Sequence, residues 1–360
     1  MGQRSKWILV GTMTAVLMAI LGILVFNFSW LRIERGGFSK EEAALRYPYQ
    51  QLTKREQALY RTLCAGIENY EETIRLPDLY SGAEYDRVFL MVCMQEPQFF
   101  YMDTVYETGE QINVVKMHYD IPQEEIAGMR AQMDIAADRI LSAANGASSE
   151  FQKLLRIHDG IAACCEYSSG DYQDEAYGCL VDGQAKCEGY AKAFLYVCRR
   201  AGISAMNVPG KIGKDENHVW NIVEMDGKYY NMDVTWDDDA QYRGLPAHIC
   251  FAQPDTLFRD HRADQTAYTP PACTDDRYNY YNMFRLTVNQ ASELPGKIEG
   301  WLDDPALLEF QFADKSVYNE AADLLANKQD VRNAVQKISG AVNFRAIADE
   351  ARNAIVILPS

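Results

Sequence analysis

The chain has little positive charge for its size. Its 35 lysine and arginine residues are outnumbered by 51 aspartate and glutamate residues, which gives a net charge of −16 over 360 residues. Such a chain repels nucleic acid, so we expect no nucleic-acid partner. Internal repeats and low-complexity tracts are also missing. With 48% hydrophobic residues, the length suits two or three packed globular units.

Charge is absent altogether from Trp7 to Trp30, an apolar run with tryptophan at both ends. A helix of this length, at about 1.5 Å per residue, crosses a hydrocarbon core of about 30 Å. A buried core helix is seldom this long without a polar face, and a cleaved signal peptide would have a shorter apolar run and a cleavage site of small residues. We therefore predict a basic head at 1–6, a retained signal anchor at 7–30, and a single-pass protein of the cell membrane with its globular part outside.

Histidine is scarce. The chain has only five, His118, His158, His218, His248 and His261. His158 precedes Asp159 in a predicted helix, where packing or capping is the expected role. His118, His248 and His261 have no paired orienting group in the sequence. His218 is left as the candidate base.

His218 begins a predicted β-hairpin. The runs HVWNIVEM and KYYNMDVTW are rich in β-branched and aromatic residues and flank Asp226-Gly227, a two-residue turn signal. The resulting register puts His218 opposite Thr235 and diagonal to Asp233 on one face of the hairpin. The Asp233 carboxylate can then orient the imidazole.

Cys187 begins the run CEGYAKAFLYVCRR, whose apolar residues have helical spacing and which ends just before Gly202. The pattern predicts a helix with the cysteine at its N-terminus, where unpaired N–H groups and the macrodipole favour a thiolate. A thiol nucleophile, a histidine base and an orienting aspartate are the groups that covalent acyl transfer requires. Cys187, His218 and Asp233 are therefore the candidate catalytic triad.

Three motifs carry a family resemblance: CEGYA at Cys187–Ala191, HVWN at His218–Asn221 and NMDVTWDD at Asn231–Asp238. In order and spacing they resemble the transglutaminase-like superfamily, a branch of the papain-like thiol enzymes. The resemblance implies the same triad and an α+β fold with a papain-like core. In that core a helix bearing the cysteine packs on an antiparallel sheet bearing the histidine and the aspartate. It also implies a bacterial, membrane-anchored member.

Several further residues are weaker candidates. Gln184 lies three residues before the nucleophile, where a papain-like oxyanion donor is expected, although the turn into the helix explains it equally well. Trp220 and Trp236 are candidate walls of a substrate groove, with core packing as the alternative. We expect the acidic run at 237–239 to be solvated, and we expect no metal and no cofactor. The eight other cysteines can be paired or free, depending on the compartment.

The remaining chain divides by composition. We predict a helical lead region with a β-hairpin at 31–146, in which two strands meet at Thr108-Gly109. The catalytic core follows at 147–267, then a linker at 268–280 and a small α/β accessory module at 281–360.

The expected function is a thiol hydrolase at the cell surface, a peptidase or amidase that cleaves peptide or glutamine-type amide bonds through a cysteine thioester. The alternatives are a protein-glutamine transglutaminase and a peptide-binding module without catalysis. The expected partners are a protein or peptide substrate and, through the N-terminal helix, the membrane.

Overall fold

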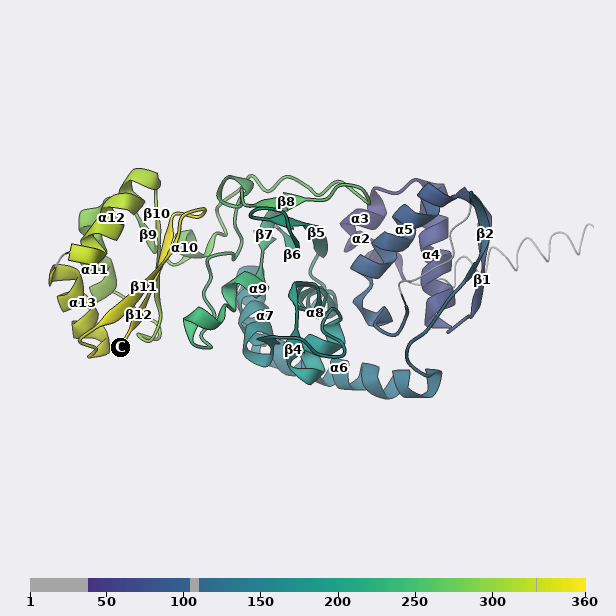
Figure 1. Cartoon of the computed structure of the whole chain (residues 1–360), viewed down its shortest axis with the longest axis horizontal. Helices are drawn as coiled ribbons and strands as arrows, with labels where there is room; N and C mark the ends of the chain where they lie inside the picture. The colour runs from purple at the N-terminus through teal and green to yellow at the C-terminus, as the bar shows by residue number, and fades with distance from the viewer. Residues whose placement is uncertain (1–37, 104–109, 328) are drawn as a thin grey trace, which may run out of the picture.

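The computed structural model describes residues 38–103, 110–327 and 329–360. They form an elongated, mixed fold of helices and sheets, with an N-terminal lobe at one end and a C-terminal module at the other (Figure 1). The expected mixture of helix and sheet is confirmed.

Among these described residues, no helix is long and apolar enough to cross a membrane. The longest, α6 (Gln123–Ala143), has 21 residues, but acidic side chains occupy its first turn and only four of its residues are buried. This finding overturns the predicted membrane partner and the predicted single-pass localisation at the cell membrane. The span on which that prediction rested, Trp7–Trp30, lies outside the described residues.

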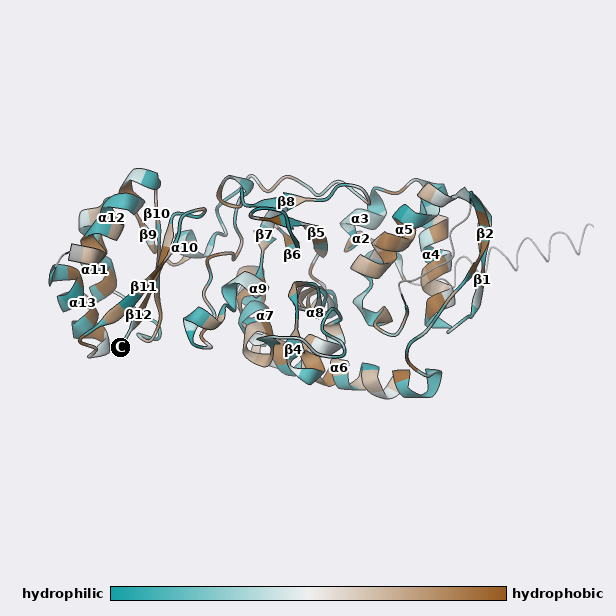
Figure 2. Cartoon of the chain, in the orientation of Figure 1, coloured by the Kyte–Doolittle hydropathy of each residue, from teal (hydrophilic) through white to brown (hydrophobic). Residues whose placement is uncertain are grey.

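The N-terminal lobe packs short helices against a two-stranded sheet. Its elements are α2 (Lys40–Ala44), α3 (Tyr47–Gln50), α4 (Lys54–Glu68), β1 (Thr73–Ser81), α5 (Gly82–Gln95) and β2 (Gln111–Lys116). Capping boxes begin three of the helices, at Ser39, Thr53 and Ser81. Figure 2 shows hydrophobic and hydrophilic residues alternating along α4 and α5, the pattern of helices with one buried side.

β2 pairs antiparallel with β1, with Thr73 opposite Lys116. Beyond β2, Tyr119 forms an antiparallel bridge with Met102, and the N–H of Asp103 donates to the carbonyl of His118. A 3-10 turn at Pro97–Phe99 precedes this bridge, and its aromatic neighbours are buried in the core. The hairpin predicted in this lobe stays a prediction. The predicted turn at Thr108-Gly109 lies outside the described residues.

The central region supports the candidate site. Its helices are α6, α7 (Glu150–Cys164), α8 (Cys187–Arg200) and α9 (Val234–Asp237). An antiparallel sheet of order β7-β6-β5-β8 joins β5 (Ala205–Ile212), β6 (Glu216–Met225), β7 (Lys228–Met232) and β8 (His261–Ala263). Two short strands, β3 (Glu166–Tyr167) and β4 (Gln184–Ala185), pair in parallel before α8. Helix α8 packs on β5 and β6.

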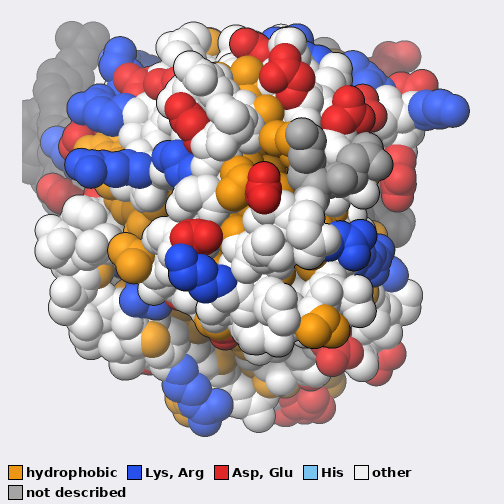
Figure 3. All heavy atoms as spheres, turned by 90° about the vertical axis from the view of Figure 1, so that its left-hand side faces the viewer, with side chains coloured by type: hydrophobic (Ala, Val, Ile, Leu, Met, Phe, Trp, Pro, Cys, Tyr) orange, Lys and Arg blue, Asp and Glu red, His pale blue; other side chains and the backbone are white. Residues whose placement is uncertain are grey.

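The C-terminal module has a four-stranded sheet of order β11-β12-β10-β9. Its elements are α10 (Tyr280–Met283), β9 (Thr287–Val288), α11 (Leu294–Glu299), β10 (Leu308–Phe312), α12 (Lys315–Asn327), α13 (Gln329–Ser339), β11 (Phe344–Asp349) and β12 (Ala354–Pro359). At the outer end of this module, side chains of both charge signs are interspersed (Figure 3). The acidity of the chain is therefore not gathered on this face.

Strand β12 faces two cores. Ile355 and Ile357 pack with the helices of the C-terminal module, whereas Ala354, Val356 and Leu358 belong to the core of the central region. Alternate residues of a strand point to opposite faces, so one strand serves both cores. The module is thereby packed directly against the part of the chain that holds the candidate site.

Candidate active site

Cys187 is the first residue of α8, as predicted. The preceding Lys186 forms no side-chain cap, so its side chain leaves the first backbone N–H groups of the helix unoccupied. A loop is held against this turn, because the N–H of Lys186 donates to the carbonyl of Gln173 over 2.8 Å. A Cβ at Gly189 would lie 2.4 Å from that same carbonyl oxygen, which explains the glycine.

His218 lies on β6, and its Nε2 is 2.6 Å from Oδ2 of Asp233. Both side chains are buried. The backbone differs from the predicted hairpin: β7 ends at Met232, and Asp233 becomes the N-cap of α9, where its Oδ1 accepts the N–H of Trp236. The predicted pairing of His218 with Thr235 is therefore wrong, because Thr235 is in the helix. The predicted contact between His218 and Asp233 is nevertheless present.

The two groups hold opposite charges. Burial lowers the pKa of His218, but the Asp233 charge, the hydrogen bond to it and the nearby Cys187 thiol outweigh burial and raise the pKa to about 10. Burial raises the pKa of Asp233, yet His218 and His261 more than offset this and hold it well below its usual range. At neutral pH the pair is an imidazolium and a carboxylate. An imidazolium is the partner that stabilises a thiolate.

His261 is a second histidine on the same carboxylate. Its Nε2 lies 3.0 Å from Asp233 Oδ2, and its Nδ1 lies 2.9 Å from Oδ1 of Asp260. The predicted lack of an orienting partner for His261 is therefore wrong. The buried Arg352 of the C-terminal module pairs with Asp260 and comes within 3.3 Å of His261 Nδ1. Sequence reasoning missed Arg352 entirely, since only the fold brings it to this place.

The two tryptophans differ in position. Trp220 is buried, donates its Nε1 hydrogen to Asn231 and lies parallel to the His218 ring, so it packs behind the histidine. Trp236 is 39% exposed and stands edge-on to His218. Gln184 is exposed on β4 and lines a hollow beside Tyr172 that does not include Cys187. The structure thus brings both tryptophans beside His218, but neither tryptophan nor Gln184 lines the hollow that contains Cys187.

Cys187 and His218 line one hollow of about 590 Å³. Its volume falls in the usual range for ligand sites, roughly 300 to 1,000 Å³. A second hollow of about 930 Å³ shares Met94, Asp174 and Glu188 with the first. Six carboxylates line this second hollow: Asp103, Asp120, Asp171, Asp174, Glu175 and Glu188. The nucleophile and the base therefore face one space that continues into an acidic one.

All nine cysteines are among the described residues and are free thiols, a point that the sequence left open. Burial raises the pKa of six of them: Cys64, Cys93, Cys179, Cys198, Cys250 and Cys273. Cys164 differs, because a hydrogen bond to Cys179 lowers its pKa.

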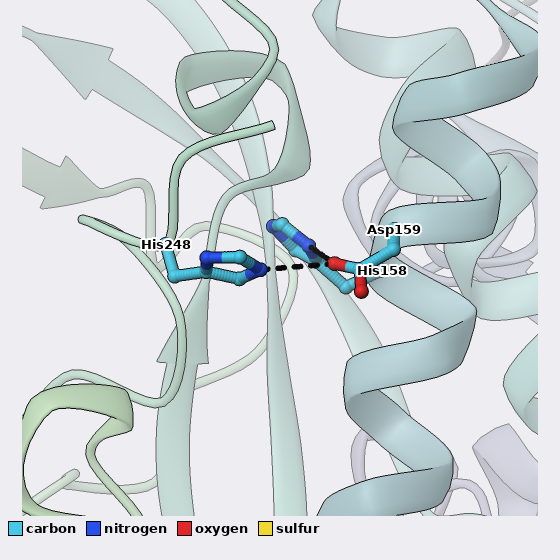
Figure 4. A group of neighbouring side chains, drawn as sticks. All are labelled: His158, Asp159 and His248. Carbon is cyan, nitrogen blue, oxygen red and sulfur yellow. Dashed lines mark hydrogen bonds and ion pairs between the residues drawn. The ribbon is translucent and has the colours of Figure 1, made fainter. Parts of the chain in front are cut away.

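A separate histidine cluster lies on α7 and the segment that follows α9. His158 and His248 both contact Asp159 (Figure 4). The predicted lack of a partner for His248 is wrong, since it also binds Glu309 of β10. The predicted solvation of Asp237 is wrong as well: this carboxylate is fully buried against His158. His158 is fully buried, in accord with the packing role expected for it.

The comparisons with known proteins agree with this geometry. Residues 137–234, which include Cys187, His218 and Asp233, match the family profile of the transglutaminase-like superfamily. Kyphoscoliosis peptidase of Homo sapiens is 33% identical over 64 residues, which cover 15% of this chain and 10% of that protein. The Mus musculus protein is 31% identical over 64 residues, with the same coverage. The chain thus spans about a tenth of the length of these curated relatives.

Two solved structures resemble this chain more weakly. A TGase crystal structure has 15% sequence identity and a TM-score of 0.28, and the match covers 36% of this chain and 43% of that one. A candidate cysteine protease from Cytophaga hutchinsonii has 16% identity and a TM-score of 0.28, with 42% and 55% covered. Scores this low carry no structural argument.

Fold and site together define a mixed α/β protein with a cysteine, a histidine and an aspartate in one cluster. The chain carries a transglutaminase-like domain. The expected bacterial origin stays a prediction.

Proposed function

We propose that the protein is a thiol-dependent acyl-transfer enzyme that hydrolyses peptide or glutamine-type amide bonds. One observation carries the proposal: Cys187, at the N-terminus of α8, shares a hollow with His218, which is bonded over 2.6 Å to Asp233. This arrangement supports a thiol triad in which Cys187 is the nucleophile, His218 the base and Asp233 the orienting group.

In the proposed first step the Cys187 thiolate attacks the substrate carbonyl carbon and forms a C–S bond. The uncapped N–H groups at the start of α8 stabilise the oxyanion. The His218 imidazolium gives its proton to the leaving amine as the C–N bond breaks, which leaves a thioester. Gln184, which lines a different hollow, is not needed for this step.

Water completes the proposed reaction. His218, now neutral, takes a proton from water, whose oxygen attacks the thioester; the C–S bond then breaks and the carboxylic acid leaves. Asp233 holds the imidazole in one tautomer throughout and stabilises its charged form. The matched human relative is named a peptidase, which favours hydrolysis.

The acidic hollow beside Cys187 supports a substrate preference. Lys192 already pairs with Glu175 and Glu188, but an extended peptide that crosses from one hollow to the other would still place side chains near Asp171 and Asp174. We propose that lysine or arginine is preferred there, because opposite charges attract and like charges oppose binding.

The same carboxylates favour amine transfer as a second candidate function. A lysine ammonium held in the acidic hollow would lie beside the thioester and, once deprotonated, could replace water as the acceptor. A peptide-binding module without catalysis is the remaining alternative.

One assay separates these functions. The full chain is incubated with casein and a fluorescent primary amine, and both peptide release and amine incorporation are measured. Hydrolysis predicts cleavage that Cys187→Ala abolishes and Cys164→Ala, the matched control, leaves in place. Cys187-dependent amine incorporation without cleavage would assign transfer instead. Casein that binds but is neither cleaved nor labelled would contradict catalysis.

A further inference from the structure

The cluster of His158, Asp159 and His248 has the arrangement of a metal site. Nδ1 of His158 lies 3.1 Å from Asp159 Oδ1, and Nε2 of His248 lies 3.0 Å from the same oxygen. Both dashed lines in Figure 4 end on that oxygen. Two imidazoles and one carboxylate thus present three donor atoms to one point, all within 4.8 Å of one another.

The outer nitrogen of each ring is held by a further buried carboxylate. Nε2 of His158 lies 3.1 Å from Asp237 Oδ2, and Nδ1 of His248 lies 2.6 Å from Glu309 Oε1. An ionised carboxylate only accepts hydrogen bonds, so these two nitrogens carry the ring hydrogens. The opposite nitrogens donate to Asp159 in the absence of an ion, and they are the ones that would release their hydrogens to bind one. Metal-binding histidines are held in this way by outer carboxylates.

The two outer carboxylates, Asp237 and Glu309, are themselves held in place by hydrogen bonds. Asp237 Oδ1 accepts the N–H of Cys250 over 2.9 Å, and Glu309 Oε2 accepts the N–H of His248 over 2.8 Å. Glu309 also accepts the hydroxyl of Tyr281. Within the described residues, no lysine or arginine pairs with the three carboxylates of this cluster. Two histidines thus stand among three carboxylates, a setting that favours a cation.

The other pair of histidines on one carboxylate suits an ion less well. There Asp233 receives His218 and His261, but the Arg352 guanidinium lies 3.3 Å from His261 Nδ1. A fixed positive charge beside the donors opposes a divalent cation. The two clusters have the same arrangement, yet in the part of the chain that the structure describes no lysine or arginine pairs with the cluster at Asp159.

We propose that His158 Nδ1, an oxygen of Asp159 and His248 Nε2 bind one divalent first-row transition metal ion of the zinc type. Donors about 2.1 Å from a tetrahedral ion are about 3.4 Å apart, close to the spacings found here. Asp159 is 30% exposed, which gives the ion an entry path and leaves a fourth position for water. Mixed imidazole and carboxylate ligands suit zinc and its neighbours better than calcium.

Such an ion would join separate parts of the fold. His158 and Asp159 lie on α7, His248 follows α9, and Glu309 lies on β10 of the C-terminal module. Asp237 ends α9, the short helix whose N-cap is Asp233. The proposed role is structural, and it goes beyond the proposed enzyme function without depending on it.

The test measures metal binding by the full chain, freed of metal with a chelator. Zinc is titrated in competition with a chromophoric chelator, and cobalt(II) is added separately as a spectroscopic probe. We expect one zinc ion per chain, with binding lost in His158→Ala and His248→Ala. Glu309→Gln should weaken binding by about 10- to 100-fold, the usual effect of an outer partner. His118→Ala, an exposed histidine elsewhere, is the matched control and should bind as the parent does.

Two results would overturn the proposal. One is the absence of a tight 1:1 complex, or a complex that His248→Ala leaves unchanged. The other is loss of the ion in Cys187→Ala or His261→Gln, or a thiolate charge-transfer band with cobalt, since either would move the ion to the thiol site. Circular dichroism shows whether a histidine variant folds. If one does not, Asp159→Asn replaces it in the binding test, because this substitution keeps the shape of the side chain.

Discussion

The molecule contains two clusters built on one plan, and they differ in what surrounds them. In the first, Asp233 Oδ2 receives His218 and His261; in the second, Asp159 Oδ1 receives His158 and His248. The first stands beside a thiol at an open hollow, whereas the second is enclosed by more carboxylates.

The difference shows that a carboxylate held between two histidines does not by itself define a catalytic site. At Asp233 the free face of His218 meets Cys187, so the charge of the imidazolium can act on a nucleophile. At Asp159 both rings have carboxylates on their outer nitrogens, and among the described residues neither ring bonds to a thiol. We therefore expect catalysis at the first cluster and a structural role, the joining of separate parts of the fold, at the second.

The same substitution in both clusters tests this division most strongly. Asp233→Asn should lower turnover by about 10⁴-fold, because an amide cannot stabilise the imidazolium and selects the wrong tautomer. Asp159→Asn should act mainly on the melting temperature and on metal binding, with a far smaller fall in turnover. Steady-state kinetics and calorimetry on both variants provide the comparison. Near-parental turnover in a folded Asp233→Asn protein would remove Asp233 from the triad.

The local elements that carry the site could be predicted from the sequence. CEGYA and the Asp226-Gly227 turn specify a helix start and a hairpin within a few residues, and the structure has both. The partners of His261 were not readable, because Asp233 lies 28 residues away and Arg352 lies 91 away. Only packing of the C-terminal module brings that arginine in.

The lead region shows a different limit. Its predicted strand before Thr108 contains aromatic residues that favour strands locally, but Phe99 and Phe100 are buried in the core outside any strand. The strand that does pair, β1, contains Pro77 and has an irregular register between Arg75 and Tyr80. Proline lowers strand propensity, so the sequence signal for β1 was weak.

Removing the second histidine from Asp233 should have a moderate effect. His261→Gln loses one hydrogen bond to the carboxylate that positions His218, so we expect about a tenfold lower kcat, equivalent to roughly 1.4 kcal/mol. The pH profile of kcat should shift as well, because His261 also holds the charge of Asp233 in place. An unchanged profile together with a lower melting temperature would make His261 merely structural.

A smaller effect should appear in stability at high pH. In the folded chain the pKa of His218 is about 10, since the neighbouring Asp233 carboxylate outweighs burial. The stability that this group contributes is complete below its unfolded pKa of about 6.5 and is lost as the pH rises through about 10. The melting temperature should therefore fall from pH 7 to pH 10, and less steeply in His218→Gln. A flat profile in the parent would contradict this raised value.

The reactivity of Cys187 at low pH tests the activated-thiol account most directly, and it needs no known substrate. Brief treatment with iodoacetamide at about pH 6, followed by peptide mapping, should mark Cys187 far faster than the other eight thiols. Cys164 is the internal comparison, because it is also partly exposed and its pKa is lowered, but no histidine pairs with it. His218→Ala should slow the reaction sharply without abolishing it, since the helix terminus still contributes roughly 0.3 to 1 kcal/mol. Equal rates at Cys187 and Cys164, or a rate that His218→Ala leaves unchanged, would contradict the account.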